Sequence, residues 1–285
     1  MKTLIAYFLV LSCSVLWLQG QSIVATVKTV DVERHTFTLS DVESDQALES
    51  PLQTRVSEGD LLVGYEGKRI RGVLSMSDGK LWLESILPVY PEGEKVMQSV
   101  NDLMRADTAV RQRREFRKEG DYGINFAMFN QDAEIVQFDQ FKGKWVIMNF
   151  IFTRCRMPEM CPAQTARMVK LQRMAKDKGI DNLQQLSVSF DPVYDTPGIF
   201  SQYAKVKGAD TSTFYFLTGD KAVMMDLLKQ YGVIAFDSKN IIDHTVTTLL
   251  FDKNGRIVLR RDGTQWNASD FVDRILQEED TDSGD

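Results

Sequence analysis

Residues 146–162, VIMNFIFTRCRMPEMCP, indicate the fold and hold two cysteines in one loop. The uninterrupted apolar run Trp145–Phe152 is typical of a central strand that is buried on both faces of a sheet. Pro162 then opens a helix, where its missing N–H costs nothing because that group has no partner in the first turn. Cys155 and Cys161 therefore lie between a strand and a helix, at the edge of the sheet where α/β proteins place their sites.

The pattern after this loop alternates between strands and helices. It predicts helix Pro162–Lys178, strand Leu186–Phe190, helix Pro197–Lys207, strand Phe214–Leu217, helix Lys221–Tyr231, the hairpin Thr245–Asp252 with Arg256–Arg260, and helix Ala268–Gln277. A hairpin of Asn125–Phe129 and Ile135–Phe138 precedes the loop. Such alternation with a terminal hairpin predicts an α/β fold over residues 121–277, with a central mixed sheet flanked by helices.

Residues 23–90 have a different character and predict a small all-β domain. The expected strands are rich in valine and threonine and are separated by tight turns: Ile23–Val32, Thr36–Leu39, Leu61–Tyr65, Arg69–Ser75 and Lys80–Leu87. Short strands of this kind favour a small barrel or sandwich, such as an OB-like barrel. His35 stands at one of the turns, where a histidine is more often a solvated surface residue than a metal ligand.

The remaining segments link or extend these two domains. Residues 91–120 combine apolar residues at helical spacing with the basic run Arg111–Arg114, which predicts a helical linker with a solvated charged face. Residues 278–285 are acidic and predict a disordered tail. Residues 1–22 read as a leader, because Lys2 precedes an uncharged apolar run.

The leader predicts an exported protein. A signal peptide cut near Gly20 is the main interpretation, and an uncleaved N-terminal anchor or a lipid attached to Cys13 are the alternatives. We therefore expect the protein in the periplasm, or anchored in a membrane and facing the periplasm. A retained leader would give it a membrane association.

The composition narrows the function classes. The 285 residues include 34 Lys+Arg and 40 Asp+Glu, for a formal net charge of −6. Nucleic-acid binding needs a clustered excess of basic residues, so we expect no nucleic-acid partner. With only 3 cysteines, the chain is also not a disulfide-dense scaffold.

The cysteine pair is the first candidate for chemistry. Without the leader and its Cys13, the chain keeps two thiols, Cys155 and Cys161. A structural disulfide between them is one interpretation, but so short a loop constrains the unfolded chain little. A functional site is the better interpretation. The helix dipole should stabilise a thiolate at this position, which predicts a lowered pKa for Cys161 above all.

His244 is the candidate third member of this site. A lone histidine is usually structural, but His244 directly precedes a predicted strand of the same sheet and can reach the cysteine loop across the strand ends. Two thiolates and one imidazole are soft to borderline donors, which suit copper or zinc and suit magnesium or calcium poorly. A site with three protein ligands also keeps an open position.

Five stretches of the chain carry a family resemblance. They are Val146–Pro162, Ser189–Tyr203 (SFDPVYDTPGIFSQY), Phe216–Gly219 (FLTG), Tyr231–Val233 (YGV) and Asp243–Gly255 (DHTVTTLLFDKNG). Together they resemble the SCO/SenC family, thioredoxin-like copper-binding proteins of cytochrome c oxidase assembly. The resemblance implies a thioredoxin-like fold, with Cys155, Cys161 and His244 as ligands of copper, either Cu(I) or Cu(II).

For function, the resemblance implies a copper metallochaperone rather than an enzyme, one that assists assembly of the copper centre of a respiratory cytochrome c oxidase. Its partner would be an oxidase subunit or another copper protein. The chain departs from the family pattern in one respect, because five residues rather than three separate its cysteines. The longer loop still allows Cys155 and Cys161 to meet as a disulfide or on one ion. Met157 and Met160 add thioethers to this loop, although methionines more often serve packing or docking.

A thiol-disulfide oxidoreductase that uses the same two cysteines is the alternative function. Oxidoreductases of this fold usually carry a proline before the strand that faces the active cysteines, and this chain has His244 there, which favours metal binding. A peroxidase and a relative that keeps the fold only as an interaction module are weaker alternatives. Asp191 is a candidate to orient His244 or the cysteine loop, or to form a turn. The segment Asp195-Thr196-Pro197 is expected to cap the following helix, and Asp243 to be a surface residue.

Overall fold

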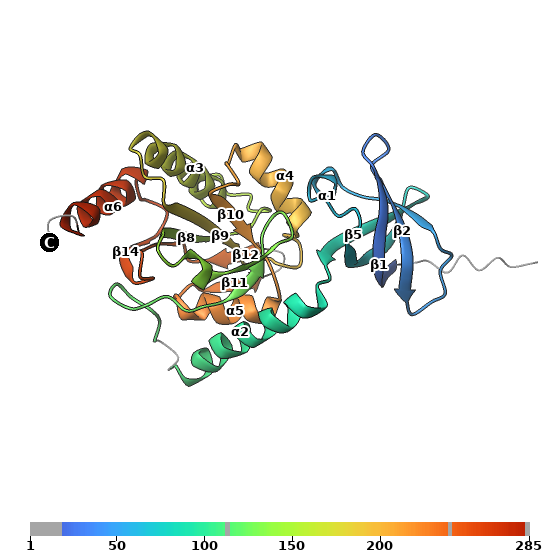
Figure 1. Ribbon diagram of the computed structural model, residues 1–285, viewed down its shortest axis with the longest axis horizontal. Helices are drawn as coiled ribbons and strands as arrows, with labels where there is room; N and C mark the ends of the chain where they lie inside the picture. The colour runs from blue at the N-terminus through green and yellow to red at the C-terminus, as the bar shows by residue number, and fades with distance from the viewer. Residues whose placement is uncertain (1–18, 112–114, 239–240, 283–285) are drawn as a thin grey trace, which may run out of the picture.

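The computed structural model describes residues 19–111, 115–238 and 241–282, which form a barrel and an α/β unit (Figure 1). The barrel comes first in the chain, and helix α2 (Pro91–Val110) leads from it to the α/β unit. Within the described ranges, no helix combines the length and the apolar character that crossing a membrane requires. Most of the predicted leader, residues 1–18, lies outside these ranges.

Five strands close the barrel in the order β1-β2-β3-β5-β4. The strands are β1 (Gln19–Asp31), β2 (Thr36–Ser44), β3 (Leu52–Arg55), β4 (Arg69–Ser77) and β5 (Lys80–Pro88). A short helix, α1 (Glu58–Leu62), lies between β3 and β4. Alternate side chains such as Val27 and Phe37 point inward and fill the core. This architecture confirms the predicted all-β domain and its OB-like character.

The prediction of one barrel strand, Leu61–Tyr65, is wrong. Leu61–Tyr65 is apolar enough to suggest a strand, but its first two residues belong to α1. Ser57 starts this helix, because its Oγ accepts a hydrogen bond from the Asp60 N–H at 3.1 Å. The strand that the pattern missed is β3, which pairs with β2 and closes the barrel against β5. Its sequence, LQTR, is too short and too polar to indicate a strand.

The α/β unit is built on a five-stranded sheet in the order β10-β9-β8-β13-β14. Its strands are β8 (Trp145–Ile151), β9 (Leu183–Ser189), β10 (Phe214–Leu217), β13 (Thr247–Phe251) and β14 (Ile257–Asp262). Strands β8, β9 and β10 are parallel, whereas β13 is antiparallel to both β8 and β14. The predicted mixed central sheet is therefore confirmed.

Helices cover both faces of this sheet (Figure 1). They are α3 (Cys161–Asp177), α4 (Pro197–Lys207), α5 (Lys221–Gln230) and α6 (Ala268–Asp282). Helix α3 packs with α6 on one face, and α5 packs with α2 on the other. The apolar residues of β8 are buried along its whole length, as the sequence predicts for a central strand.

Two small hairpins accompany the sheet, one before β8 and one between α5 and β13. The first, β6 (Ala127–Phe129) with β7 (Ile135–Gln137), was predicted, and the 3-10 helix η1 (Phe138–Phe141) follows it. The second, β11 (Ala235–Ser238) with β12 (Ile241–His244), was not. Its short strands, AFDS and IIDH, mix polar and apolar residues and show no clear strand pattern.

Helix α6 is longer than predicted and takes in the first acidic residues of the expected tail. It continues to Asp282, so the prediction of disorder from Glu278 is wrong for the part of the tail that the structure describes. Glu279 is held in place, because it accepts a hydrogen bond from Trp145 Nε1 at 3.0 Å and pairs with Lys253 Nζ at 3.0 Å. Residues 283–285 lie outside the described part.

The linker is helical only in its first part, since α2 ends at Val110 rather than near residue 120. Residues 115–122, which we term the strap, run along the outer edge of β14. The Gly120 N–H donates to the Ile257 carbonyl at 2.8 Å, and the Ile257 N–H donates to the Asp121 carbonyl at 2.9 Å. The strap therefore covers an edge strand that would otherwise offer unpaired backbone groups.

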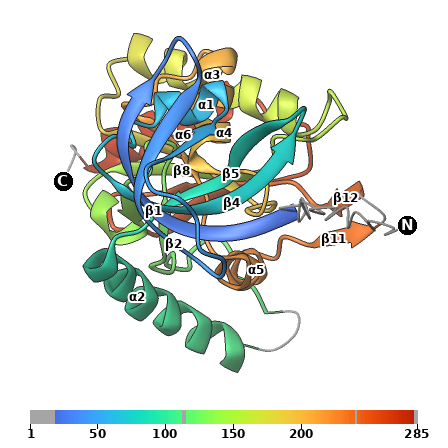
Figure 2. The same ribbon diagram turned by 90° about the vertical axis from the view of Figure 1, so that its right-hand side faces the viewer.

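The barrel contacts the α/β unit directly. Helix α1 crosses the start of α4 (Figure 2). The crossing is so close that a Cβ atom on Gly59 would lie 2.1 Å from the Gly198 carbonyl oxygen. Ala133, from the turn between β6 and β7, is fully buried within the barrel core. The two bodies therefore share packed surfaces in addition to their covalent link.

Candidate functional site

The structure brings the two predicted cysteines together at the carboxyl end of β8. Cys155 lies in the loop after β8, and Cys161 is the first residue of α3. The two cysteines are in the thiol form in this structure, and their side chains form a hydrogen bond. Cys155 is partly exposed, whereas Cys161 is only 1% exposed. The longer spacing between the cysteines thus does not separate their sulfur atoms.

The predicted lowering of the Cys161 pKa is wrong. Burial raises the pKa of the Cys161 thiol well above its usual range, and the neighbouring Cys155 adds to the rise. A backbone hydrogen bond from Phe152 acts in the opposite direction without cancelling it. The start of α3 does lie at this cysteine, but its dipole does not outweigh the loss of water around a thiolate.

Asp191 holds the cysteine loop through Arg154. The Asp191 Oδ2 atom accepts hydrogen bonds from Arg154 Nε at 2.8 Å and from Arg154 Nη2 at 2.5 Å. The same guanidinium group stacks on the ring of Tyr194, 4.5 Å from its centre. Because Arg154 directly precedes Cys155, these contacts fix the backbone beside the first thiol. This agrees with the interpretation of Asp191 as a residue that orients the cysteine loop.

The segment Asp195-Thr196-Pro197 opens α4 as predicted, and within it Asp195 anchors the cysteine loop. Asp195 is fully buried, and accepts hydrogen bonds from the Thr153 hydroxyl and, at 2.6 Å, from the Ser189 hydroxyl. The cap of α4 is Thr196, which accepts a hydrogen bond from the Ile199 N–H at 3.4 Å. Burial raises the pKa of Asp195 to about 6.

His244 is placed by its backbone alone, because the side chains of residues 241–244 lie outside the described part. It is the last residue of β12, and the next N–H, that of Thr245, donates to the Ile234 carbonyl at 3.0 Å. Thr245 lines an open groove of about 500 Å³, and Met160 of the cysteine loop lines the same groove. The chain beside His244 and the cysteine loop therefore border one space.

The other sequence candidates lie as follows. Met157 is 50% exposed, and its carbonyl oxygen accepts a weak hydrogen bond from Cys155 Sγ at 3.8 Å. The Asp243 side chain lies outside the described part. His35 is exposed at the turn between β1 and β2, in agreement with a surface residue. Among the side chains that the structure describes, no three or more of His, Cys, Asp and Glu form a metal-holding group, and that set leaves out His244.

Sequence reasoning missed Thr153 and Arg154, the partners of the two loop-holding carboxylates. A usable signal was present, since both residues follow one parallel strand and Asp191 and Asp195 follow its neighbour. Residues at the carboxyl ends of adjacent parallel strands meet at one sheet edge. Phe116 of the strap also borders the groove, and no sequence pattern indicated it.

The fold and the paired cysteines together define a thioredoxin-like protein with a dithiol after its central strand. The family model described as SCO1/SenC matches residues 114–278, more than half of the chain. The chain belongs to the SCO1/SenC family, which confirms the resemblance found in the sequence. The match begins after the barrel and α2.

Individual relatives agree with this assignment. The SCO1 protein homolog of Bacillus subtilis is 35% identical over 151 residues, which cover 52% of this chain and 77% of that protein. The SCO2-like protein RP587 of Rickettsia prowazekii is 28% identical over 141 residues, which cover 47% of this chain and 66% of that protein. The match therefore spans just under two thirds of the length of the Rickettsia relative.

Solved structures match the α/β unit. A SCO1/SenC family lipoprotein from Bacillus anthracis has a TM-score of 0.52 and 28% identity, over 57% of this chain and 98% of that chain. The structure of Arabidopsis thaliana ScoI with copper bound has a TM-score of 0.50 and 21% identity, over 56% of this chain and 99% of that chain. These likenesses support the thioredoxin-like fold.

Proposed function

We propose that this chain is a copper-binding metallochaperone that assists assembly of the copper centre of a respiratory cytochrome c oxidase. The observation that carries the proposal is the contact between the thiols of Cys155 and Cys161, beside the groove that Thr245 lines. Copper is the cargo of the protein in this proposal. Its ligands are Cys155, Cys161 and His244.

The donor set favours copper over harder cations. Thiolate sulfur selects Cu(I), and imidazole nitrogen is accepted by copper in proteins. The buried Cys161 thiol has to lose its proton to bind, and a soft cation bonded to sulfur provides the stabilisation that water cannot provide there. Membership of the SCO1/SenC family and the copper found with Arabidopsis ScoI support the same choice.

The contacts around the loop support binding without large rearrangement. Asp191 holds Arg154, and Asp195 holds Thr153, so that the two residues before Cys155 are both fixed by buried carboxylates. A loop that is already ordered loses less conformational entropy when a ligand binds. The partial exposure of Cys155 leaves one sulfur accessible to a donor or recipient.

We propose an exported location and a copper protein as the recipient, in the first place an oxidase subunit. Transfer is an exchange of ligands: a thiolate or imidazole of the recipient bonds to copper as the bond to Cys155 breaks. No electron is transferred in this step, and the released thiolate takes up a proton from water. The leader sequence supports export to the compartment where such a recipient would be met.

The proposal is tested by copper binding to the full-length, reduced chain, measured by competition with a chelator for Cu(I). We expect one tightly bound copper per chain. Replacing Cys155 or Cys161 by Ser, or His244 by Ala, should weaken binding by more than about 100-fold, since residues that only support ligands are commonly worth 10- to 100-fold.

His35→Ala is the matched control for the histidine variant, because the chain contains only 2 histidines. It should bind copper as tightly as the unmutated chain does. Absence of tight binding in the unmutated chain, or an equal loss in the His35 variant, would contradict the proposal.

The same contact between two thiols supports a second candidate, a thiol-disulfide oxidoreductase. The Cys155 thiolate would attack a partner disulfide, and Cys161 would then release the partner as a dithiol while a Cys155–Cys161 disulfide forms. The partner gains two electrons, and the protein loses two. Such an activity should survive His244→Ala, whereas the copper proposal expects the same substitution to weaken copper binding strongly.

A further inference from the structure

We propose that Phe116 of the strap is a positioning residue for His244: it fixes the base of the β11–β12 hairpin, at whose end His244 stands. The inference rests on the proposed function, because it takes His244 as a copper ligand. It adds a residue that lies far from the cysteines in sequence and belongs to the linker from the barrel.

Phe116 lies directly against the turn that leads into β11. Its ring is so close to Gly232 that a Cβ atom on the glycine would lie 2.6 Å from the ring. Gly232 also has a φ of +67°, a conformation that favours glycine. The backbone of the turn is therefore packed against an aromatic ring, which limits where β11 can begin.

Arg260 of β14 holds the ring and the turn together. Its guanidinium group stacks on the Phe116 ring, 4.7 Å from the centre. The same group donates a hydrogen bond to the Tyr231 carbonyl at 2.9 Å and another to the Arg117 carbonyl at 3.3 Å. One side chain of the sheet thus ties the strap to the residue before Gly232.

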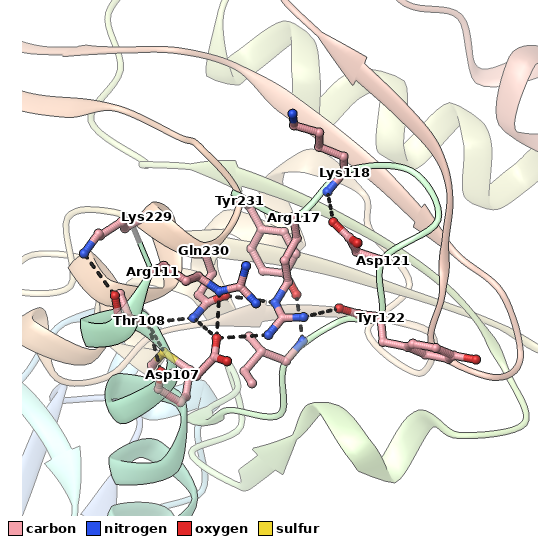
Figure 3. Close-up of polar contacts among 12 residues, drawn as sticks. Asp107, Thr108, Arg111, Arg117, Lys118, Asp121, Tyr122, Lys229, Gln230 and Tyr231 are labelled. Atoms are coloured by element: carbon pink, nitrogen blue, oxygen red, sulfur yellow. Dashed lines mark hydrogen bonds and ion pairs between the residues drawn. The ribbon is translucent and has the colours of Figure 1, made fainter. Parts of the chain in front are cut away.

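The next strap residue, Arg117, anchors this arrangement (Figure 3). Its backbone N–H donates to the Gln230 carbonyl at 2.8 Å, and its Nε donates to Gln230 Oε1 at 2.9 Å. Its other nitrogens reach the Tyr122 carbonyl at 2.7 Å and the Asp107 carboxylate at 3.1 Å. Arg117 is 9% exposed, so these charge-assisted bonds are largely shielded from water. The strap cannot slide along the turn without breaking them.

The held turn continues into the two ends of the hairpin base. The Ile234 N–H donates to Thr245 Oγ1 at 3.0 Å, and the Thr245 N–H donates to the Ile234 carbonyl at 3.0 Å. Thr245 is bonded covalently to His244. A shift of the turn at Gly232 is therefore transmitted across this pair of hydrogen bonds to the backbone of His244.

The groove brings the same elements to the cysteine loop. Phe116, Thr245 and Met160 all line it, and Met160 precedes Cys161. Phe116 thus borders the same space as the chain next to His244 and the loop that carries the thiols. Its role as a positioning residue follows from its contact with the turn at Gly232, which leads into the hairpin.

The test compares Phe116→Ala and Phe116→Leu with Arg105→Ala in the full-length chain. Arg105 pairs with Asp226 at 2.8 Å and also joins the linker to the α/β unit, but it does so away from the hairpin. The first measurement needs no metal: hydrogen exchange of residues 234–246. Phe116→Ala should speed exchange of the Thr245 amide by about tenfold or more, Phe116→Leu should largely restore protection, and Arg105→Ala should leave it unchanged.

The second measurement is Cu(I) affinity and the Cu(II) absorption and EPR spectra, in a double-mutant cycle with His244→Ala. Phe116→Ala should weaken copper binding by about tenfold and reduce the imidazole contribution to the Cu(II) spectra. In the His244→Ala background it should have no further effect. An equal loss in both backgrounds, or unchanged exchange at Thr245, would overturn the positioning role. If the unmutated chain binds no copper, the proposed function fails, and the exchange measurement still decides whether Phe116 fixes the hairpin.

Discussion

At the scale of single residues, the two thiols of the site have different environments. Cys155 is partly exposed in the loop, whereas Cys161 is buried at the start of α3 with a raised pKa. The sequence could indicate both cysteines, because residue type and a strand-to-helix position are readable from it. It could not indicate the difference in their environments, because burial depends on the packing of the whole sheet.

This difference predicts selective alkylation of the two thiols. In a Cys13→Ser background, iodoacetamide at pH 8 should modify Cys155 at least about tenfold faster than Cys161, because Cys161 is 1% exposed and its pKa is raised. Mass spectrometry of peptic peptides at timed intervals measures both rates, since trypsin would cut after Arg154 and Arg156 and leave Cys155 in a dipeptide. In urea the two rates should become equal, and equal rates in the native protein would contradict the burial of Cys161.

At the scale of elements, the sequence predicts the helices and strands whose own residues mark their start, their end or their apolar pattern. Helix α4 begins and ends as predicted, since Pro197 opens it and Gly208 follows its last residue. The β11–β12 hairpin and β3 were missed because their short sequences, AFDS, IIDH and LQTR, mix polar and apolar residues, whereas the equally short β10, FYFL, is apolar throughout and was predicted. The strap was misread as helix because its structure depends on β14, which is distant in sequence.

The residues of the candidate site also divide into those that the local sequence indicates and those that depend on contacts distant in sequence. Asp191 was a candidate to orient the cysteine loop, since a carboxylate after a parallel strand lies at the functional edge, but a turn role was left open beside it. The segment Asp195-Thr196-Pro197 was correctly interpreted as the start of α4, whereas the hold of Asp195 on the cysteine loop was missed because its partners, Thr153 and Ser189, come from other segments. Tertiary contacts of this kind cannot be derived from local spacing alone.

The crossing of α1 and α4 leads to a prediction for Gly59→Ala. The new methyl group would lie 2.1 Å from the Gly198 carbonyl oxygen, and backbone atoms cannot move aside at small cost. We expect a loss of about 1–3 kcal/mol in the free energy of unfolding and faster proteolysis between the barrel and the α/β unit. Urea denaturation and limited trypsin digestion measure these effects.

The matched control for that variant is Gly219→Ala. The atom nearest to its methyl group would be Met128 Cγ, at 3.5 Å, which is an ordinary van der Waals contact, so the change should have little effect. If the free energy of unfolding fell equally in both variants, the close crossing of α1 and α4 would not be the cause of the loss in Gly59→Ala.

At the scale of the whole molecule, the barrel and its linker contact elements that adjoin the candidate site. Helix α1 of the barrel meets α4 at Gly198, three positions after Asp195, which holds the cysteine loop. The strap meets the turn at Gly232, which leads into the hairpin that carries His244. A family match that begins at residue 114 omits the barrel, yet in this chain the barrel packs against the elements that hold the site.

The joint between the two bodies contains a buried carboxyl group, which predicts a pH dependence of stability. Asp60 is 6% exposed, and burial raises its pKa to about 6 from 3.8. A Cβ atom on Gly198 would lie 2.2 Å from Asp60 Oδ1, so the carboxyl group sits against α4. Between these two pKa values the folded protein binds more protons than the unfolded chain does. The contribution of Asp60 to stability is therefore greatest below pH 3.8 and is lost as the pH rises through about 6.

Asp60→Asn should remove the loss of stability that ionisation of Asp60 causes as the pH rises. At pH 7.5 we expect the variant to be more stable than the unmutated chain by up to about 3 kcal/mol, and at pH 4 by much less. Thermal unfolding at both pH values, with Asp31→Asn on the barrel surface as control, measures the difference. A gain of equal size at the two pH values would contradict a role for the charge of Asp60.

The strap along β14 has a consequence for the order in which the molecule can be completed. The strap residue Glu119 bonds to Arg260, 141 positions further along the chain. All five barrel strands lie within the first 88 residues, so most of the barrel can form from chain that is synthesised early. The strap, although made soon afterwards, has to wait for almost the whole of the remaining chain before its partner exists. The backbone pairing of the strap with the sheet therefore cannot form before β14 has been made, and until it forms the outer edge of β14 stays open to other chains.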